Sequence, residues 1–218
     1  MKQQIDHEKS GKDFGASCIA WFKLADLITR REKEKALNLY RLLSHSFEDK
    51  AYALQLEADM LWSLEDNLSL KKYVQAAFLY EKENRFICAF AVYQHLLTLK
   101  PQNFDYLSKL LNLCFLLSWE EKFEKNYNIL LEHLDNGFIT QDQVFVVSSK
   151  LINYLCDVDF HKRAVSDQEE LKYSLSKEER KKFKWVLKSL AFILKKKNNK
   201  LYERIKDYCS EKNLNFNS

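Results

Sequence analysis

The feature that most constrains this chain is an apolar pattern that recurs after 34 residues. Matching positions in the stretches 73–96 and 107–130 carry side chains suited to a core: Tyr73, Ala76, Ala77, Tyr80, Ala89, Tyr93 and Leu96 in the first, and Leu107, Leu110, Leu111, Cys114, Phe123, Tyr127 and Leu130 in the second. Spacings of three and four residues place each set on helix faces. The pattern predicts two amphipathic helices joined by a tight turn, and this helix pair is repeated once.

The residues between the expected helices agree with this interpretation. Pro101 would end the second helix of the first pair, and Asn103 could cap the next helix. Asn136-Gly137 is typical of a helix end, and capping-box patterns stand at 118–121, 140–143, 166–169 and 176–179. The 218 residues include only 3 Gly and 1 Pro, which leaves little material for hairpins or phosphate-binding loops. The sequence therefore predicts an all-α chain.

Three segments outside the repeat are also expected to be helical. An additional helix is predicted at roughly 49–64, with Leu54, Ala58, Leu61 and Trp62 on its apolar face. The helix expected at 69–83 could pair either with it or with the helix at 86–99, and the sequence leaves both open. The strand-like run 144–147 is expected to be helical because a capping box precedes it and apolar residues with helical spacing follow it. A last helix is expected at 199–212, with a frayed tail after it.

The segment 71–101 resembles a tetratricopeptide repeat, with the family's pattern at Tyr73, Ala76, Ala77, Tyr80, Ala89, Tyr93, Leu96 and Pro101. The segment 18–46 resembles an earlier copy, with Trp21, Leu24, Ala25, Ile28, Ala36, Tyr40 and Leu43. The resemblance implies an α-solenoid, a superhelix of about ten or eleven helices in antiparallel pairs. It would span 14–198, after a polar tail at 1–13 and before a last short helix and tail at 199–218.

The same resemblance implies a concave groove that binds a segment of a partner protein, as in a scaffold or adaptor. Its candidate lining residues are Phe22, Asp26, Arg30, Lys71, Val74, Phe78, Lys82, Ser108, Asn112 and Phe115. Members that clamp a peptide carboxylate use Lys and Asn where this chain has Phe22 and Asp26, and another Lys where it has Asp105, which argues against such a clamp. The same residues could instead pack against extra helices. A narrower alternative is a chaperone of a secreted protein, similar to those of type III secretion.

The segment 177–197 concentrates positive charge, with eight Lys and one Arg against two Glu, a net charge of 9 − 2 = +7. An apolar stripe through Leu187, Leu190 and Leu194 lies apart from its lysines. The interpretation we favour is a capping helix that closes the solenoid. The alternative is binding to a membrane surface or to nucleic acid through Lys181, Lys184, Trp185, Lys188 and Lys195.

No pattern in the sequence favours catalysis. The five His are scattered and no nucleophile pattern accompanies them, so we expect no enzyme, no cofactor and no small-molecule substrate. The cluster Cys156–His161 could bind a metal, but no second ligand pair with zinc spacing supports it. The five Cys have no disulfide spacing, the amino terminus lacks a signal sequence and no apolar run is long enough to span a membrane, so we expect a cytoplasmic protein.

Overall fold

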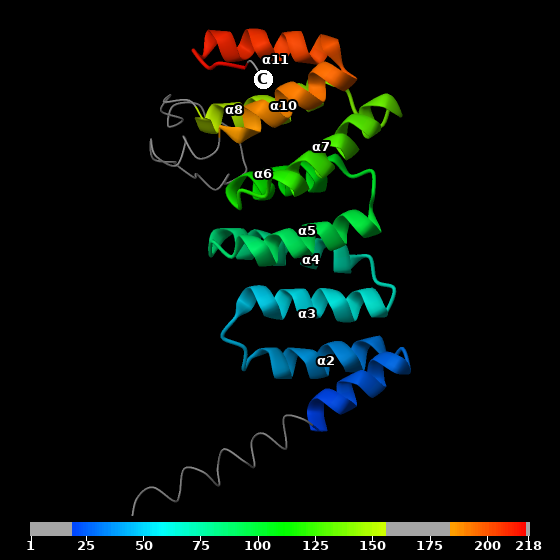
Figure 1. Ribbon diagram of the computed structural model, residues 1–218. Coiled ribbons are helices and arrows are strands. Elements are labelled where there is room, and N and C mark those ends of the chain that lie inside the picture. Colours follow the sequence, from blue (N-terminus) through cyan, green and yellow to red (C-terminus); the bar gives the residue numbers. More distant parts are fainter. Residues whose placement is uncertain (1–18, 156–183, 217–218) are drawn as a thin grey trace, which may run out of the picture. The chain divides into compact units, whose positions relative to one another are not determined.

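The computed structural model describes residues 19–155 and 184–216, and within these ranges every regular element is a helix. This confirms the all-α prediction. The helices, with the labels of Figure 1, are a first one at 19–29, then α2 (Lys33–Ser44), α3 (Lys50–Ser63), α4 (Leu68–Lys82), α5 (Phe86–Leu99), α6 (Phe104–Leu116), α7 (Glu120–Asp135), α8 (Gln141–Leu155), α10 (Trp185–Lys197) and α11 (Asn199–Glu211).

The chain divides into two compact units, 1–79 and 80–218, and the boundary falls inside α4. In unit 1 the helix at 19–29, α2 and α3 share one core built on Leu24, Ala36, Tyr40 and Met60. The Tyr40 hydroxyl donates to the carbonyl of Ala53 and so ties α2 to α3. Fully buried alanines at the helix contacts allow the backbones to approach closely.

The additional helix, α3, also packs against α4. The Tyr73 hydroxyl donates to Oδ1 of Asp59 at 2.5 Å, and Lys72 Nζ lies 2.8 Å from a Glu57 carboxylate oxygen. Asp49 caps the start of α3 by accepting from the Tyr52 amide at 2.9 Å. The helix predicted at 49–64 is therefore confirmed, and it is an ordinary layer of unit 1, with α2 and α4 as packing neighbours.

Four connections between helices share one tight turn, in which a residue other than glycine has positive φ: Arg31 (58°), Glu65 (58°), Asn84 (59°) and Ser118 (55°). In each, the next residue donates its amide to a carbonyl five positions back, at 2.8–2.9 Å, as in a Schellman motif. The turns at 31 and 65 are 34 residues apart, and so are the turns at 84 and 118. The turns therefore form two series, each with a spacing of 34 residues, which we call two registers: Arg31 and Glu65 in the first, Asn84 and Ser118 in the second. Helix α4 lies between the last turn of the first register and the first turn of the second.

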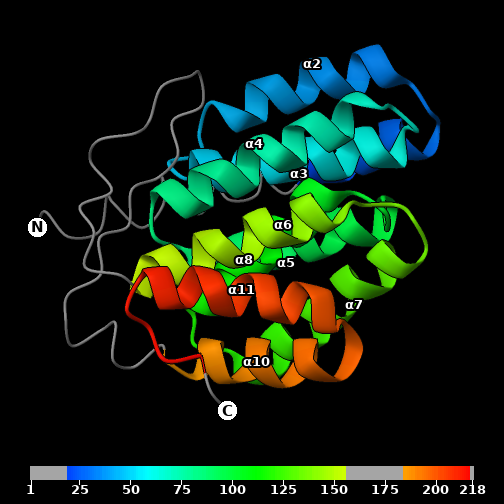
Figure 2. The same cartoon turned by 90° about the horizontal axis from the view of Figure 1, so that it is seen from above.

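Unit 2 buries both predicted sets of repeat residues from position 80 onward, including Ala89, Tyr93, Leu110, Phe123 and Tyr127. Helix α6 packs between α5 and α7. Helix α7 then contacts α8 and α10, and α11 covers both α8 and α10 (Figures 1 and 2). Contacts also join α6 to α8 and α8 to α10.

Several expectations about helix ends are settled. Asn103 caps α6, accepting from the Tyr106 amide at 3.0 Å. The capping box at 140–143 forms, with the Thr140 amide donating to Gln143 Oε1 at 2.8 Å and the Gln143 amide donating to Thr140 Oγ1 at 3.3 Å. Gly137 has a φ of +74° just after α7, as predicted for a helix end. The strand-like run 144–147 lies in α8.

Two expectations are wrong, and two lie outside the described residues. Ser118 makes no capping box, because it occupies the left-handed turn and α7 begins only at Glu120. The tail after α11 is not frayed as far as Phe216, because that ring is buried and its centroid lies 5.6 Å from that of Tyr202. The capping boxes predicted at 166–169 and 176–179 fall outside the described residues.

Candidate functional site

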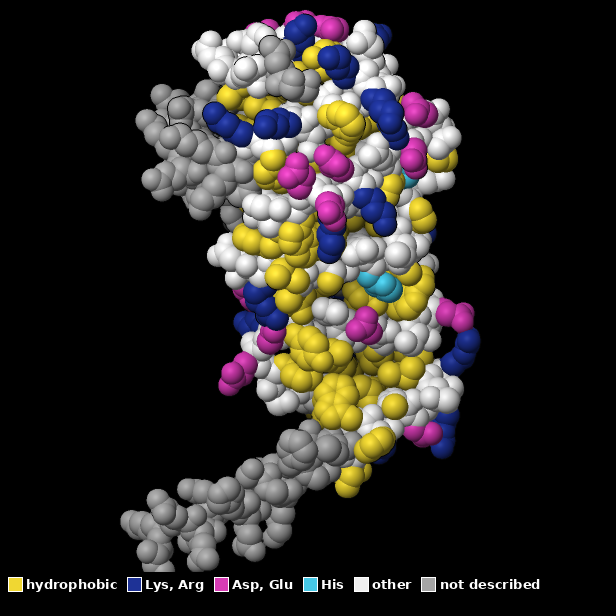
Figure 3. All heavy atoms as spheres, viewed as in Figure 1, with side chains coloured by type: hydrophobic (Ala, Val, Ile, Leu, Met, Phe, Trp, Pro, Cys, Tyr) yellow, Lys and Arg dark blue, Asp and Glu magenta, His cyan; other side chains and the backbone are white. Residues whose placement is uncertain are grey.

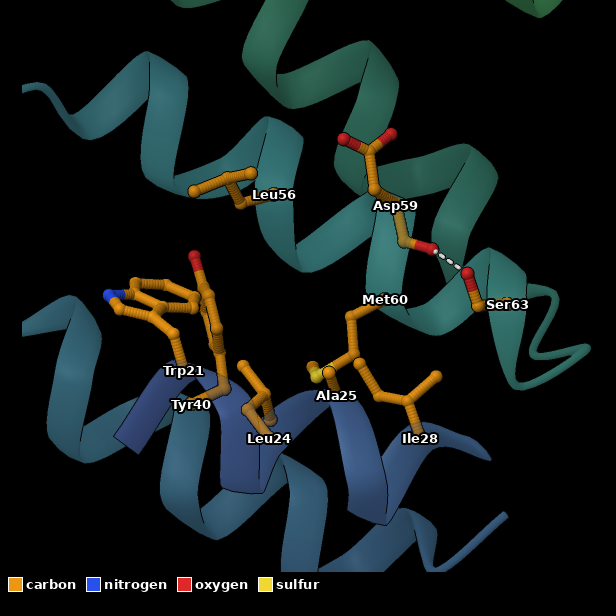
Figure 4. Close-up of a pocket in the computed structure, with 9 residues that line it drawn as sticks. All are labelled: Trp21, Leu24, Ala25, Ile28, Tyr40, Leu56, Asp59, Met60 and Ser63. Atoms are coloured by element: carbon orange, nitrogen blue, oxygen red, sulfur yellow. Dashed lines mark hydrogen bonds between the residues drawn. The ribbon is translucent and has the colours of Figure 1, made fainter. Parts of the chain in front are cut away.

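The strongest candidate site is a cleft in unit 1, between the helix at 19–29 and α3 (Figure 4). Its volume is about 230 Å³, and its walls are mostly apolar. The first helix contributes Trp21, Leu24, Ala25 and Ile28, α2 contributes Tyr40, and α3 contributes Leu56, Asp59, Met60 and Ser63. Leu24, Tyr40 and Met60 are buried and belong to the core of unit 1. The cleft is therefore an opening onto the core.

Both polar residues of the cleft already hold hydrogen bonds within unit 1. Asp59 accepts the hydroxyl of Tyr73 at 2.5 Å, and the Ser63 hydroxyl donates to the carbonyl of Asp59 at 2.9 Å. Burial raises the pKa of the Tyr73 hydroxyl well above its ordinary value, and the bond to Asp59 adds to this, so the hydroxyl keeps its proton. The chemistry that the cleft offers is thus apolar contact.

A row of aromatic rings borders the cleft. The Trp21 ring lies 5.8 Å from that of Phe47, and Phe47 lies 6.1 Å from Tyr52 in an edge-on arrangement. Tyr52 precedes Leu56 by one helical turn, and its side chain is 44% exposed. In Figure 3 apolar side chains gather over this part of unit 1. The cleft and its aromatic border form one apolar surface, which we call the apolar surface of unit 1: Trp21, Ala25, Ile28, Phe47, Tyr52 and Leu56.

The predicted groove residues of unit 1 divide into two groups. Phe22 is 77% exposed, and Asp26 and Arg30 beside it are exposed but pair with each other at 3.0 Å. Lys71 is exposed, whereas Val74 and Phe78 are half-buried. None of these six lines the cleft. Phe22, Asp26 and Arg30 lie on another face of the first helix or beyond its end, and the other three lie on α4, which contributes nothing to the cleft.

The predicted groove residues of unit 2 do not form an apolar wall. Lys82 is exposed, and Ser108 and Asn112 are half-buried. Phe115 is fully buried, and its ring stacks on Tyr154 of α8 with 5.5 Å between centroids. The prediction that Phe115 lines a groove is therefore wrong, because α8 covers it.

Sequence reasoning missed the residues that do form the apolar surface. It assigned Trp21, Ala25 and Ile28 to the core, although Ala25 is exposed and the other two are partly exposed. On α3 it chose Trp62, which is 45% exposed, and overlooked Leu56 and Met60, which line the cleft. The spacing of Tyr52, Leu56, Asp59 and Ser63 by three and four residues was the available signal for this second face.

The basic helix α10 buries its apolar stripe, including Val186, Leu190 and Leu194. Lys184, Lys188 and Lys195 are exposed, whereas Trp185 is half-buried, 5.4 Å from the ring of Phe123. Lys181 lies outside the described residues. The helix does not end the chain of packed helices, because α11 packs against it and against α8.

Across 19–155 and 184–216, no group of three His, Cys, Asp or Glu side chains is placed to hold a metal ion, and the Cys156–His161 cluster lies outside these ranges. Of the helices described, none combines the length and the apolar character needed to span a bilayer. Comparison of the chain with protein-family models, with curated proteins and with solved structures found no match.

Proposed function

We propose that this chain is a protein-interaction module that receives an apolar helical segment of another protein on the apolar surface of unit 1. The observation that carries the proposal is the opening between the helix at 19–29 and α3, which leaves Trp21, Ala25 and Leu56 accessible beside the core. A packed helical core normally closes over such residues, so an accessible apolar patch of this kind is typical of an interaction site.

The size of the cleft favours side chains of a protein over a small molecule. Sites for small molecules usually enclose about 300–1,000 Å³ and present a few converging polar groups. This cleft has about 230 Å³, and its two polar residues already make hydrogen bonds within the chain. One or two apolar side chains of a docked segment would fill it.

The shape of the site favours a helix as the docked segment. Trp21, Ala25 and Ile28 form one ridge at spacings of four and three residues, and Tyr52, Leu56 and Asp59 form a second on α3. The furrow between two such ridges accepts the ridge of a third helix. We therefore expect bound segments to carry large apolar residues at spacings of three, four and seven.

We also propose that the helices follow a tetratricopeptide-like repeat. Its support is the recurrence of the same left-handed turn after 34 residues, at Arg31 and Glu65 and again at Asn84 and Ser118. Further support comes from the contacts of α6 with α8 and of α8 with α10, because stacked helix pairs bring every second helix together.

The test is selection of 16-residue peptides from a displayed random library against the whole protein, followed by affinity measurement on synthetic peptides. Ala25→Trp fills the cleft from an exposed position, and Ala91→Trp is the matched control because Ala91 is an exposed alanine of α5. We expect Ala25→Trp to weaken binding by at least about 30-fold, as for loss of a central hot spot, and Ala91→Trp to leave it unchanged. Selected peptides that bind the Ala25→Trp protein as tightly as the parent would refute the proposal.

A further inference from the structure

Exposed lysines gather on α10 and the start of α11. Residues 184–202 include Lys184, Lys188, Lys195, Lys196, Lys197 and Lys200 and no Asp or Glu. All six are exposed, and in the part of the chain that the structure describes none lies within ion-pair distance of a carboxylate. Some lysines elsewhere do pair with a carboxylate, for example Lys33, Lys72 and Lys109.

Three of these lysines share one face of α10 with an exposed aromatic ring. Lys184, Lys188, Phe192 and Lys195 follow each other at intervals of four, four and three residues, so they form a row along the helix. Phe192 is 63% exposed. The opposite face is buried against α7, α8 and α11, and Figure 2 shows α10 at the outer edge of unit 2. We call this row the basic face of α10.

Folding of the helix does not account for the whole basic face. Lysines at 195–197 suit the carboxyl end of α10, where the helix dipole favours positive charge. Lys184 and Lys188 stand at the opposite end, at the N-cap and in the first turn, where the dipole disfavours them. An exposed phenyl ring among them contributes nothing to the core.

We propose that the basic face of α10 docks on an anionic membrane surface, with Phe192 entering the headgroup region between the lysines. A row of ammonium groups on an outer helix matches a plane of negative charge, and a single phenyl ring adds apolar contact at the interface. The lysine stems can bend toward the headgroups while their charges stay in water. In Figure 3 dark-blue side chains lie over this end of unit 2.

The basic face fits a membrane better than nucleic acid. Base recognition combines Arg or Lys at guanine with Asn or Gln at adenine, whereas the row on α10 offers lysines and one phenyl ring and no amide side chain among them. Proteins that bind single-stranded nucleic acid hold it in a groove in which several aromatic side chains stack on the bases. The basic face has one aromatic ring, on the outside of one helix.

Flotation of the full chain with vesicles tests the proposal, comparing phosphatidylcholine alone with phosphatidylcholine containing phosphatidylserine. We expect binding only to the anionic vesicles, and weaker binding as salt rises. Each lysine at such a surface contributes about five-fold in affinity. Lys184→Gln, Lys188→Gln and Lys195→Gln together should therefore weaken binding about 100-fold, and Phe192→Ser should weaken it about ten-fold.

The matched control replaces three exposed lysines elsewhere, Lys71, Lys82 and Lys125, by Gln, which changes the net charge equally. Its vesicle binding should stay close to that of the parent protein, and circular dichroism should show every variant folded. The proposal would be overturned if the parent protein does not bind anionic vesicles, or if the control variant binds them as weakly as the α10 variant. Binding of a 20-nucleotide RNA, lost in the α10 variant and without vesicle binding, would assign the face to nucleic acid instead. Ala25→Trp should leave vesicle binding unchanged, so this proposal can fail independently of the peptide-binding one.

Discussion

A buried hydrogen bond between α7 and α8 leads to a prediction with a worked magnitude. The Tyr127 hydroxyl lies 2.8 Å from the Ser148 hydroxyl, and both side chains are fully buried. Ser148 has one hydroxyl proton, and it donates that proton to the carbonyl of Val144 at 2.9 Å. Tyr127 must therefore donate to Ser148. Burial also raises the pKa of Tyr127 far above its ordinary value, so the donor keeps its proton at neutral pH.

Removing the Ser148 hydroxyl should lower the free energy of unfolding more than removing the Tyr127 hydroxyl. Ser148→Ala leaves a buried tyrosine hydroxyl without an acceptor, which costs about 2 kcal/mol. Tyr127→Phe leaves Ser148 still donating to Val144 and costs about 1 kcal/mol. The double variant removes both polar groups, so its cost should be about 1 kcal/mol, far below the roughly 3 kcal/mol that independent effects would give.

Hydrogen–deuterium exchange of peptides from α7 and α8 measures these changes as opening free energies. Ser148→Ala should speed exchange there about 30-fold. Ser149→Ala is the control, because the exposed Ser149 hydroxyl donates to the Val146 carbonyl of its own helix, and its effect should stay within about 0.5 kcal/mol. Additive costs in the double variant would refute the reasoning, because they would mean that the Tyr127 and Ser148 hydroxyls are not hydrogen-bonded to each other.

Three further predictions concern single residues. Phe216→Ala should destabilise α11 by about 3 kcal/mol in exchange measurements, because the buried ring packs on Tyr202, whereas loss of a frayed residue would change nothing. Burial raises the pKa of Cys114 to about 11, so at pH 8 its alkylation by iodoacetamide should be about 100-fold slower in the native protein than in urea, as followed by mass spectrometry. The bond from Lys33 holds the pKa of Asp66 below its ordinary value, so the pair should stabilise unit 1 above about pH 4. That contribution should be lost as the pH falls further. Urea unfolding at a series of pH values should therefore show a smaller loss of unfolding free energy toward low pH for Asp66→Asn than for the parent protein.

The helices could be predicted from the sequence because their apolar spacing is strict. Every member of the two repeat sets, from Tyr73 to Leu130, is buried. The turns were harder to predict. Ser118 begins a capping-box pattern, yet it adopts positive φ, because the two amide-to-carbonyl bonds that end α6 fix the turn before α7 begins. The tail was missed for a different reason, since one Phe in a polar stretch gives no periodic signal.

The candidate site could not be predicted because exposure depends on what covers a helix. Trp21 and Phe115 carry equal apolar signals in the sequence. Phe115 is covered by Tyr154 of α8, whereas Trp21 borders an opening toward α3. The family resemblance placed partner-binding residues at fixed repeat positions, which presumes that the same helix of every pair faces the same side along the whole chain.

The turns on the two sides of α4 show that the 34-residue spacing is not continuous along the chain. The left-handed turns at Arg31 and Glu65 make the helix at 19–29 and α3 the first members of their pairs, with α2 and α4 second. The turns at Asn84 and Ser118 make α4 and α6 first members instead. Helix α4 is thus the second helix of one register and the first of the next. The candidate groove residues on the helix at 19–29 and those on α4 and α6 therefore belong to different registers, so their repeat positions alone do not define one common groove. The candidate cleft accordingly uses only the helix at 19–29, α2 and α3, all of which precede the change of register.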